Sequence, residues 1–356
     1  MMLHWMPVMA IGCVCGAAEG GVVENNPFVT LPRVAPAYTR LFEQFQDYEV
    51  ILRPDKDEAE WWAGAPSVAL GADGIFWMAC RMRTAESERG LRGYEIRILR
   101  SADGVHFERV HSLRREQVPI AGFERPALLR DRKTGLFKLY GCGPWAGGAW
   151  GIFKFADAET PEEFDPKSGR LVIAAPEKSY GRDVSVLEYK DPVIIYAGGQ
   201  YHCYVTGYMR RNERIYHFAS DDGEVWAPVG NPYVSIMPLS GWHDFFVRPA
   251  SVVPLGVGYL FVYEGGKTDW YDPVYNIGTG LGFTFDLHTI TDLTPEQPLL
   301  VSSTPSLHFA TFRYTHWMLI DNAMWVYAEA ACPNDTHEIR LFRVPFVETR
   351  PKPFKE

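Results

Sequence analysis

Residues 187–208, LEYKDPVIIYAGGQYHCYVTGY, contain in one place a pattern that recurs along the chain. The charged pair Lys190 and Asp191 precedes a proline, and an apolar run rich in β-formers follows. Gly198 and Gly199 separate that run from a second one in which aromatic residues alternate. This order predicts a β-hairpin. Lys190 and Asp191 stand at its mouth, where a half-buried charge needs either a partner or a chemical role.

The same proline-headed hairpin pattern occurs four more times. The other copies begin at Gly64-Ala65-Pro66, Glu124-Arg125-Pro126, Arg248-Pro249 and, without the proline, Thr315-His316. They recur every 55 to 70 residues or so, roughly the kelch period and longer than that of a WD-type blade. Five units over residues 47–343 predict an all-β, five-bladed β-propeller with four-stranded antiparallel blades around a central funnel. A two-sheet sandwich is the alternative, but it gives no reason for a proline-headed strand at near-constant spacing.

Composition limits the class of protein and its partners. A chain of 356 residues with 47% hydrophobic and 22% charged residues has ample material for a globular core. A net charge of −9 without a run of Lys or Arg argues against nucleic acid or an anionic membrane as partner. Aromatic residues make up 14% of the chain, more than a core needs, and exposed rings would suit the apolar faces of sugars.

We divide the chain into a leader (residues 1–25), a tether or closing strand (26–47), the propeller (48–345) and a C-terminal tail (346–356). Residues 1–18 are apolar and end in small residues, which is typical of a secretory signal. The segment Ala10-Ile11-Gly12-Cys13 loosely matches a lipoprotein cleavage box. These features predict a secreted or periplasmic protein, with lipid anchoring at Cys13 or a buried N-terminal strand as the alternatives.

Four cysteines follow the leader, namely Cys80, Cys142, Cys203 and Cys332. They lack the close spacing of a metal site, so we predict half-buried core cysteines and no cofactor, and nothing in the sequence indicates an ion at the propeller axis. A disulfide between Cys80 and Cys142 stays open for an exported protein.

Four further segments have recognisable local patterns. The segments 101–107, SADGVHF, and 220–226, SDDGEVW, predict turns in which Asp caps and Gly takes a left-handed conformation, joining the outer strands of blades one and three. Residues 160–163, TPEE, predict a short capped helical turn. The long connection 231–246, which holds Trp242, is predicted to form an ordered wall of a pocket.

At these residues the chain resembles the five-bladed propeller glycosidases, the group of glycoside hydrolase families 32, 43, 62, 68, 117 and 130. It is most similar to family 130, the β-mannoside phosphorylases and mannosidases. The matching segments are 101–107, 122–126 for the family's Gly-x-Glu-Asp-Pro-Arg, 190–191 for its Lys-Asp, 263–265 for its Tyr-His-Gly, and 275–300 for its closing stretch. The resemblance covers most of residues 48–345.

The departures from the family pattern affect the chemistry. Arg125 replaces the Asp that the resemblance would make the general acid, and an arginine cannot donate a proton at ordinary pH. Ala65 stands where family 43 has a catalytic Asp before proline. Glu264 replaces the phosphate-binding His, and its carboxylate would repel phosphate, which favours hydrolysis over phosphorolysis.

Cleavage of a glycosidic bond needs one carboxylic acid and one carboxylate. The first strand of each blade lines the channel, so the mouths of the blades converge whatever their separation in sequence. We therefore predict Glu124, Asp191 and Glu264 as catalytic residues, without deciding which is acid and which is base. The predicted substrate-binding residues are Trp62, Arg81, Arg125, Lys190, Trp242, His243, Asp244, Arg248 and His316, with Asp244 as a reserve acid.

The sequence thus predicts an exported, single-domain glycoside hydrolase that cleaves a plant, algal or microbial oligo- or polysaccharide. A non-catalytic carbohydrate-binding propeller is one alternative, because Ala65 and Arg125 replace acids. A β-mannoside phosphorylase-like enzyme is another. A structural reading also remains for individual residues, since Glu124 and Arg125 are the two halves of a plausible ion pair.

Overall fold

The computed structural model describes residues 45–175, 186, 188–209, 212–304, 306 and 308–346. The predicted leader with Cys13, and all of the predicted tail except Phe346, lie outside the described residues. Within the described part of the chain, no helix is long and apolar enough to cross a membrane.

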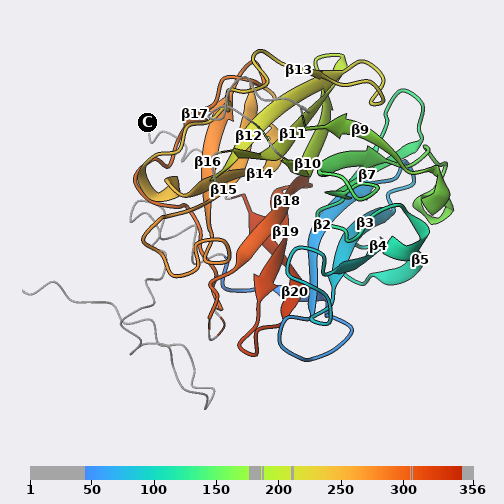
Figure 1. Ribbon diagram of the computed structural model, residues 1–356, viewed down its shortest axis with the longest axis horizontal. Coiled ribbons are helices and arrows are strands. Elements are labelled where there is room, and N and C mark those ends of the chain that lie inside the picture. Colours follow the sequence, from blue (N-terminus) through green and yellow to red (C-terminus); the bar gives the residue numbers. More distant parts are fainter. Residues whose placement is uncertain are drawn as a thin grey trace, which may run out of the picture.

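Five antiparallel blades surround a central axis, and they follow one another around it in chain order (Figure 1). A parallel bridge between Trp62 and His337 joins blades one and five into one eight-stranded sheet. Blade one contains β2 (Trp62–Leu70), β3 (Phe76–Arg83), β4 (Gly93–Ser101) and β5 (Glu108–Arg114). Blade two contains β6 (Ala127–Arg130), β7 (Phe137–Pro144), β8 (Trp150–Lys154) and β9 (Arg170–Ala174). Blade three contains β10 (Glu188–Ala197), β11 (Gln200–Met209), β12 (Asn212–Ser220) and β13 (Ala227–Pro228). Blade four contains β14 (Phe246–Pro254), β15 (Tyr259–Gly266), β16 (Gly278–Thr284) and β17 (Thr291–Asp292). Blade five contains β18 (Phe312–Ile320), β19 (Ala323–Ala331) and β20 (His337–Pro345). The predicted five-bladed propeller is confirmed, and each predicted hairpin forms the inner pair of its blade.

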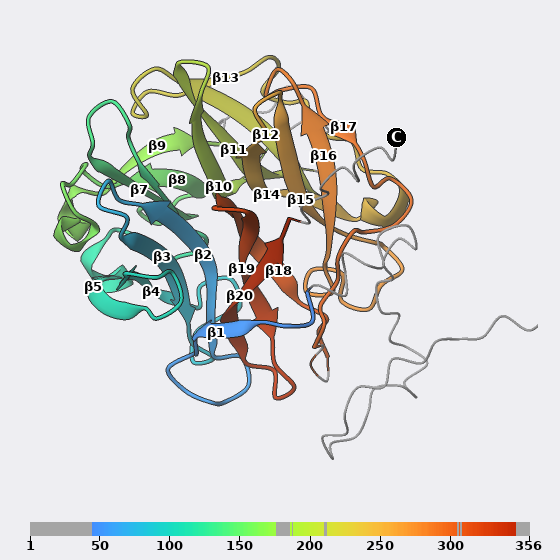
Figure 2. The same cartoon turned by 180° about the vertical axis from the view of Figure 1, so that it is seen from behind.

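The ring is closed by β1 (Glu49–Leu52), which pairs antiparallel with β20 and supplies the fourth strand of blade five. Figure 2 shows β1 running beside β20, far in sequence but adjacent in space. This strand begins just after the range 26–47 in which a tether or closing strand was predicted. Closure in this way joins the two ends of the propeller through backbone hydrogen bonds and leaves fewer open sheet edges.

The inner strands of blades one, three and five bend at the same place. Each contains a β-bulge, and the bulged residues Ala65, Asp191 and Tyr314 have φ values of 52°, 55° and 52°. A left-handed conformation is uncommon for residues other than glycine, and a bulge re-aims the side chains around it. The bulges therefore determine which side chains at the blade mouths point toward the axis.

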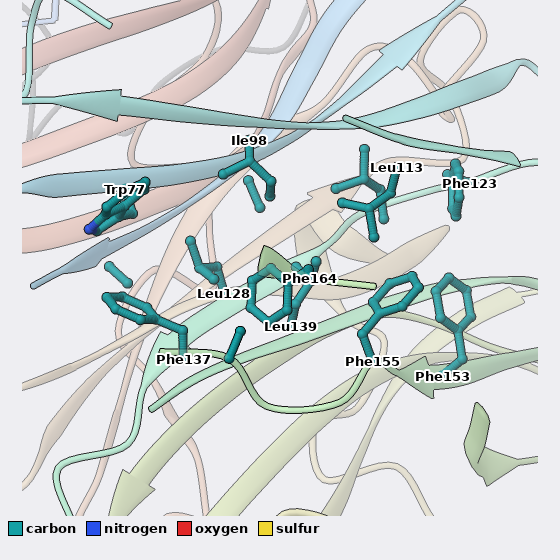
Figure 3. Close-up of a cluster of buried hydrophobic side chains, with 14 of the residues drawn as sticks. Trp77, Ile98, Leu113, Phe123, Leu128, Phe137, Leu139, Phe153, Phe155 and Phe164 are labelled. Carbon is teal, nitrogen blue, oxygen red and sulfur yellow. The ribbon is translucent and has the colours of Figure 1, made fainter. Parts of the chain in front are cut away.

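The apolar core lies between neighbouring blades. Figure 3 shows the cluster in which Trp77, Ile98 and Leu113 of blade one face Phe137 and Leu139 of blade two. Full burial of side chains of this size stabilises the fold by roughly 2 to 3 kcal/mol each. Packing of this kind between every pair of neighbours holds the blade mouths at fixed positions around the axis.

The cysteines of the described chain are all free. They were predicted to be half-buried, and three of the four are fully buried, while Cys332 is partly buried. No disulfide therefore joins Cys80 to Cys142. Burial raises the pKa of the Cys80 thiol to about 12. A thiol that stays protonated acts here as a small apolar side chain and is unreactive.

The predicted turns are also confirmed. Asp103 accepts backbone hydrogen bonds from Val105 and His106, and Gly104 has a φ of 73°, while Asp222 and Gly223 repeat this arrangement. The short helices are η3 (Arg115–Gln117), η4 (Pro161–Glu163), η5 (Pro166–Ser168) and η6 (Gly241–His243). Of these, η4 is the predicted capped turn and begins with a capping box.

Candidate active site

A cavity of about 270 Å³ opens at the axis. All five blades contribute to its wall, through Arg83, Arg89, Gly90, Glu124, Trp150, Glu188, Lys190, Arg248, Val274, Tyr275, Arg313 and Tyr314. Its volume lies near the lower end of the range for small-molecule sites, which suits a ligand of one or two sugar rings. Three predicted residues, Glu124, Lys190 and Arg248, lie in this wall.

Glu124 stands immediately before blade two and forms an ion pair with Arg81, which is completely buried. Burial opposes ionisation of Glu124, but the positive charges of Arg81, Arg83 and Arg313 outweigh burial and lower its pKa. Arg81 also donates to Glu329 at 2.8 Å. Glu124 is thus held as a carboxylate, and its partner is Arg81 rather than the adjacent Arg125.

Glu188, at the start of β10, is a second carboxyl group in the cavity wall. Burial raises its pKa, the negative charge of Glu213 adds to this effect, and Lys190 opposes it. Two carboxyl groups of one cavity, Glu124 and Glu188, therefore have pKa values shifted in opposite directions. Such a separation distinguishes a proton donor from a proton acceptor.

Lys190 on β10 and Arg248 on β14 are held by a single carboxylate on β12. Both contact Glu213, Lys190 through Nζ and Arg248 through Nε. Burial opposes ionisation of Glu213, yet Arg248 and Lys190 lower its pKa to about 2. Glu213 thus fixes the orientation of two cations that face the cavity.

Asp191 is fully buried and lies outside the cavity wall. Its backbone N–H donates to Cys142 Sγ at 3.1 Å, and neither carboxyl oxygen has a hydrogen-bond partner in the described structure. Burial raises its pKa, and the charge of Glu124 adds to this effect. Direct contact of Asp191 with a substrate is therefore not supported by its position.

Glu264 is likewise fully buried behind the wall. It accepts a hydrogen bond from the backbone N–H of Thr315 at 3.3 Å. Burial raises its pKa to about 7, although Arg125, Arg248 and Arg313 act in the opposite direction. The repulsion of phosphate predicted for Glu264 does not operate in the cavity wall, because the carboxyl group does not reach it.

Arg125 crosses the axis instead of facing the cavity. Its guanidinium donates to the backbone oxygens of Pro249, Ala250 and Thr315, at 2.9, 2.5 and 3.5 Å. These bonds connect blade two to the inner strands of blades four and five. Arg125 therefore acts as a structural tie. His316 does not line the cavity either. Burial and the positive charge of Arg125 lower its pKa to about 3.

Trp62 was predicted to stack on a sugar ring, but both of its faces are covered. The His337 ring is stacked 3.7 Å from it, and the Arg83 guanidinium lies 3.9 Å from its ring centroid. Its Nε1 donates to the backbone oxygen of Asp335 at 3.0 Å. Trp62 is thus a platform that positions Arg83.

The connection around η6 does not form a wall of the cavity. Trp242 is buried and stacks with Tyr263 and Trp270, at centroid distances of 5.7 and 6.2 Å. His243 Nε2 lies 3.1 Å from Asp292, and Asp244 accepts hydrogen bonds from Thr268. The segment packs on blade four, and we assign a structural role to these three residues, which were predicted to bind substrate.

The largest group that sequence reasoning missed is a cationic part of the wall with a tyrosine at its centre. The Tyr275 hydroxyl accepts from Arg83 Nη2 and Arg89 Nε, both at 3.3 Å. Burial opposes ionisation of this phenol, but Arg83 and Arg313 lower its pKa to about 8. A signal was present, because Arg83 lies two residues after the predicted Arg81 and strand residues two apart share a face.

Within the described residues, no group of three or more His, Cys, Asp or Glu side chains is arranged to hold a metal ion.

No family model matches the sequence, and no curated protein matches it either. The fold is nevertheless shared with solved structures. A glycosyl hydrolase from Bacteroides ovatus is 14% identical, with a TM-score of 0.60 and coverage of 91% of this chain and 96% of that one. A β-1,2-mannobiose phosphorylase from Listeria innocua is 12% identical, with a TM-score of 0.60 and coverage of 85% and 96%.

A third similar structure belongs to glycoside hydrolase family 130, described as a family of mannoside phosphorylases that contains hydrolases of β-1,2 mannosidic linkages in Candida mannan. It is 13% identical, has a TM-score of 0.60, and is covered over 95% of its length by 86% of this chain. Likeness at these identities shows that the chain has the fold expected from the resemblance to the propeller glycosidases.

Proposed function

We propose that this protein is a glycoside hydrolase that cleaves O-glycosidic bonds of a plant, algal or microbial oligo- or polysaccharide in the axial cavity. The observation that carries the proposal is the pair Glu124 and Glu188. Both line the same cavity, and their surroundings shift their pKa values in opposite directions. Glycoside hydrolysis needs such a pair, one member protonated and the other ionised.

Glu124 takes the role of the ionised carboxylate in this proposal, because Arg81 holds it and three arginines lower its pKa. It attacks the anomeric carbon or activates a water molecule. Glu188 takes the role of the acid and protonates the departing oxygen, because burial keeps its proton bound to higher pH. Lys190 and Arg248 are proposed to contact sugar hydroxyls from the same wall.

Asp191 and Glu264 are proposed to act from behind the wall. Burial raises the pKa of both carboxyl groups, which reduces their neutralisation of the cations close to them. The cavity then keeps a positive potential that supports the ionised form of Glu124. In this proposal both residues are positioning groups rather than groups that touch the substrate.

Two other functions are compatible with this fold and cavity. A phosphorylase would use the cationic wall to bind phosphate. A mannobiose phosphorylase is among the similar structures, but at 12% identity it does not decide the reaction of this chain. A carbohydrate-binding propeller without catalysis is the other, because Ala65 and Arg125 replace acids that relatives use. Export with a signal in residues 1–18, and lipid anchoring at Cys13, remain predictions that cell fractionation tests.

The test is a screen of the purified protein against aryl glycosides and plant, algal and microbial oligosaccharides, with and without phosphate. Glu124→Gln and Glu188→Gln are assayed beside Glu108→Gln, an exposed glutamate on β5 that serves as control. Sugar release without phosphate, lost in the first two variants and kept in the third, supports the proposal. Sugar phosphate formed only with phosphate indicates a phosphorylase. Thermal protection by a glycan without turnover indicates a binding protein.

A further inference from the structure

The charges of the cavity wall are unbalanced. Four arginines and one lysine line it, namely Arg83, Arg89, Arg248, Arg313 and Lys190, against the two glutamates Glu124 and Glu188. Lys190 and Arg248 share Glu213, and Arg313 is bound to Glu329. Among the described residues, no carboxylate lies within 4.0 Å of the guanidinium of Arg83, although Glu124 acts on it at longer range.

Arg83 is only 3% exposed and is fixed in orientation. Trp62 covers one face of its guanidinium at 3.9 Å, and its Nη2 donates to Tyr275. Its buried Nε has no hydrogen-bond partner in the described structure. An arginine stays charged in proteins, so a buried guanidinium without a counter-ion is costly unless an anion compensates it. The side chain borders the cavity, and the cavity is where that anion can enter.

Arg89 and Tyr275 extend this site toward the rim. Arg89 donates to the Tyr275 hydroxyl at 3.3 Å and contacts Asp272 at 3.3 Å, and its side chain is 59% exposed. Arg83 and Arg313 lower the pKa of Tyr275 to about 8, although burial opposes this, so the phenol lies in the positive potential of these arginines. A guanidinium presents parallel N–H donors that match the two oxygens of a carboxylate.

We propose that Arg83, Arg89 and Tyr275 form a binding site for the carboxylate of an acidic sugar, so that the substrate is a glycan containing uronic acid. The inference rests on the proposed function and narrows its substrate class. The carboxylate of the sugar ring is held at the arginines, and the glycosidic bond faces Glu124 and Glu188.

An oxyanion at these arginines has two sources, a sugar carboxylate and free phosphate. The carboxylate is favoured by the ionised Glu124 of the same wall. A uronic acid carries a single negative charge, whereas a phosphate group carries more than one at pH 7, about −1.5 to −2 in a monoester. Repulsion from Glu124, whose ionised form Arg83 itself supports, is therefore greater for phosphate.

The test compares sugars that differ only in the oxidation of carbon six. Methyl glucuronoside and methyl galacturonoside, methyl glucoside and methyl galactoside, and inorganic phosphate are titrated calorimetrically into the full-length protein. Arg83→Met and Arg89→Met are the test variants, and Arg132→Met, at an exposed turn position after β6, is the matched control. The same four sugars, as aryl glycosides, are assayed for hydrolysis.

We expect a uronoside to bind at least about 30-fold more tightly than its neutral partner, since losing one partner of a buried charged pair has about that effect. Arg83→Met removes the preference and Arg132→Met keeps it. If Arg83→Met does not fold, Arg89→Met provides the test, because the exposed Arg89 side chain is not needed for folding. We expect Arg89→Met to weaken uronoside binding about 5-fold, since this contact is partly screened by solvent.

Equal or tighter binding of the neutral sugars, with hydrolysis observed, overturns the acidic-sugar inference and leaves the hydrolase proposal standing. Phosphate binding lost in Arg83→Met, without preference between the sugars, assigns the arginines to phosphate and also overturns it. If none of the four sugars is bound or hydrolysed, the acidic-sugar inference is overturned. If the wider glycan screen also shows no turnover, the proposed function is overturned as well.

Discussion

Arg81 and Glu329 form an ion pair at 2.8 Å in which neither side chain has any exposed surface. The other end of the Arg81 guanidinium contacts Glu124 at the cavity wall. The pair therefore connects the buried charges of blades one and five to the carboxylate that we propose for catalysis. Its removal changes both the stability of the fold and the ionisation of that carboxylate.

Glu329→Gln is expected to destabilise the fold by about 3 to 5 kcal/mol, the usual result of breaking a buried ion pair from one side. Glu329 also accepts hydrogen bonds from Arg313 and His337, so the change leaves several buried donors without a charged partner. Urea unfolding of the variant measures the loss. The exposed Glu108→Gln should change the free energy of unfolding by less than about 0.5 kcal/mol. Equal stability of the two variants would contradict the prediction.

Arg81→Met is expected to raise the pKa of Glu124, because Arg81 supplies the largest stabilising charge to that carboxylate. The acidic limb of the kcat/KM profile then moves to higher pH. Rates measured across pH for the wild type and for Arg100→Met, an arginine on the outer part of blade one, provide the comparison. A profile of Arg81→Met that superimposes on the wild type would show that Glu124 is not the group that titrates.

His217 is expected to make the fold sensitive to acid. Burial and the neighbouring His202 and His288 lower its pKa to about 3, while Asp286 opposes the shift and Tyr204 stacks on the ring. The unfolded chain binds a proton near pH 6.5, whereas the folded chain does so only near pH 3. Stability from this residue is therefore complete above pH 6.5 and is lost as the pH falls.

The loss due to His217 amounts to at most about 1.4 kcal/mol per pH unit in that window. His217→Gln removes it, so the free energy of unfolding should fall less between pH 7 and pH 5 than in the wild type. Urea denaturation at both values measures the difference. An identical fall in both proteins would mean that His217 does not carry this dependence.

Asp191→Asn is expected to preserve the fold and to stabilise it at neutral pH. Burial raises the pKa of Asp191, so the unfolded chain releases this proton at a lower pH than the folded chain does. Ionisation therefore favours the unfolded state increasingly as the pH rises from the unfolded pKa toward the folded pKa, and the amide removes this term. The gain grows by at most about 1.4 kcal/mol per pH unit. Asn also tolerates the φ of 55°, whereas Asp191→Ala should be about 1 kcal/mol less stable than the amide variant. Thermal unfolding at pH 8 ranks the three proteins, and an amide variant less stable than the wild type would contradict the account.

The fold was predictable from sequence because each inner hairpin has a local sequence pattern. A proline-headed apolar run, a Gly-containing turn and a second alternating run recur in four copies. The fifth copy lacks the proline and the glycine, and all five form the first two strands of a blade. Closure by β1 has no such local signal, since a strand of four residues acquires its place only by pairing with β20, far away in the sequence.

The site was predictable only in part, because the bulges decide where neighbouring side chains point. Lys190 and Asp191 are adjacent and were both predicted to face the funnel. The bulge after Lys190 leaves that residue in the cavity wall and buries Asp191. The second carboxyl group of the cavity was predictable from strand alternation, since Glu188 lies two residues before Lys190 on the same strand and therefore on the same face. Tyr275 and Arg313 reach the cavity through tertiary packing, which no local pattern reveals.

The most direct test of the central claim is the kcat/KM of Glu124→Gln on the best glycoside found in the screen, in phosphate-free buffer, against the wild type and Glu108→Gln. The account predicts a loss of at least about 100-fold, as expected for an essential catalytic group, with the fold intact by circular dichroism and the control unchanged. A Glu124→Gln variant that hydrolyses the glycoside at the wild-type rate would contradict it.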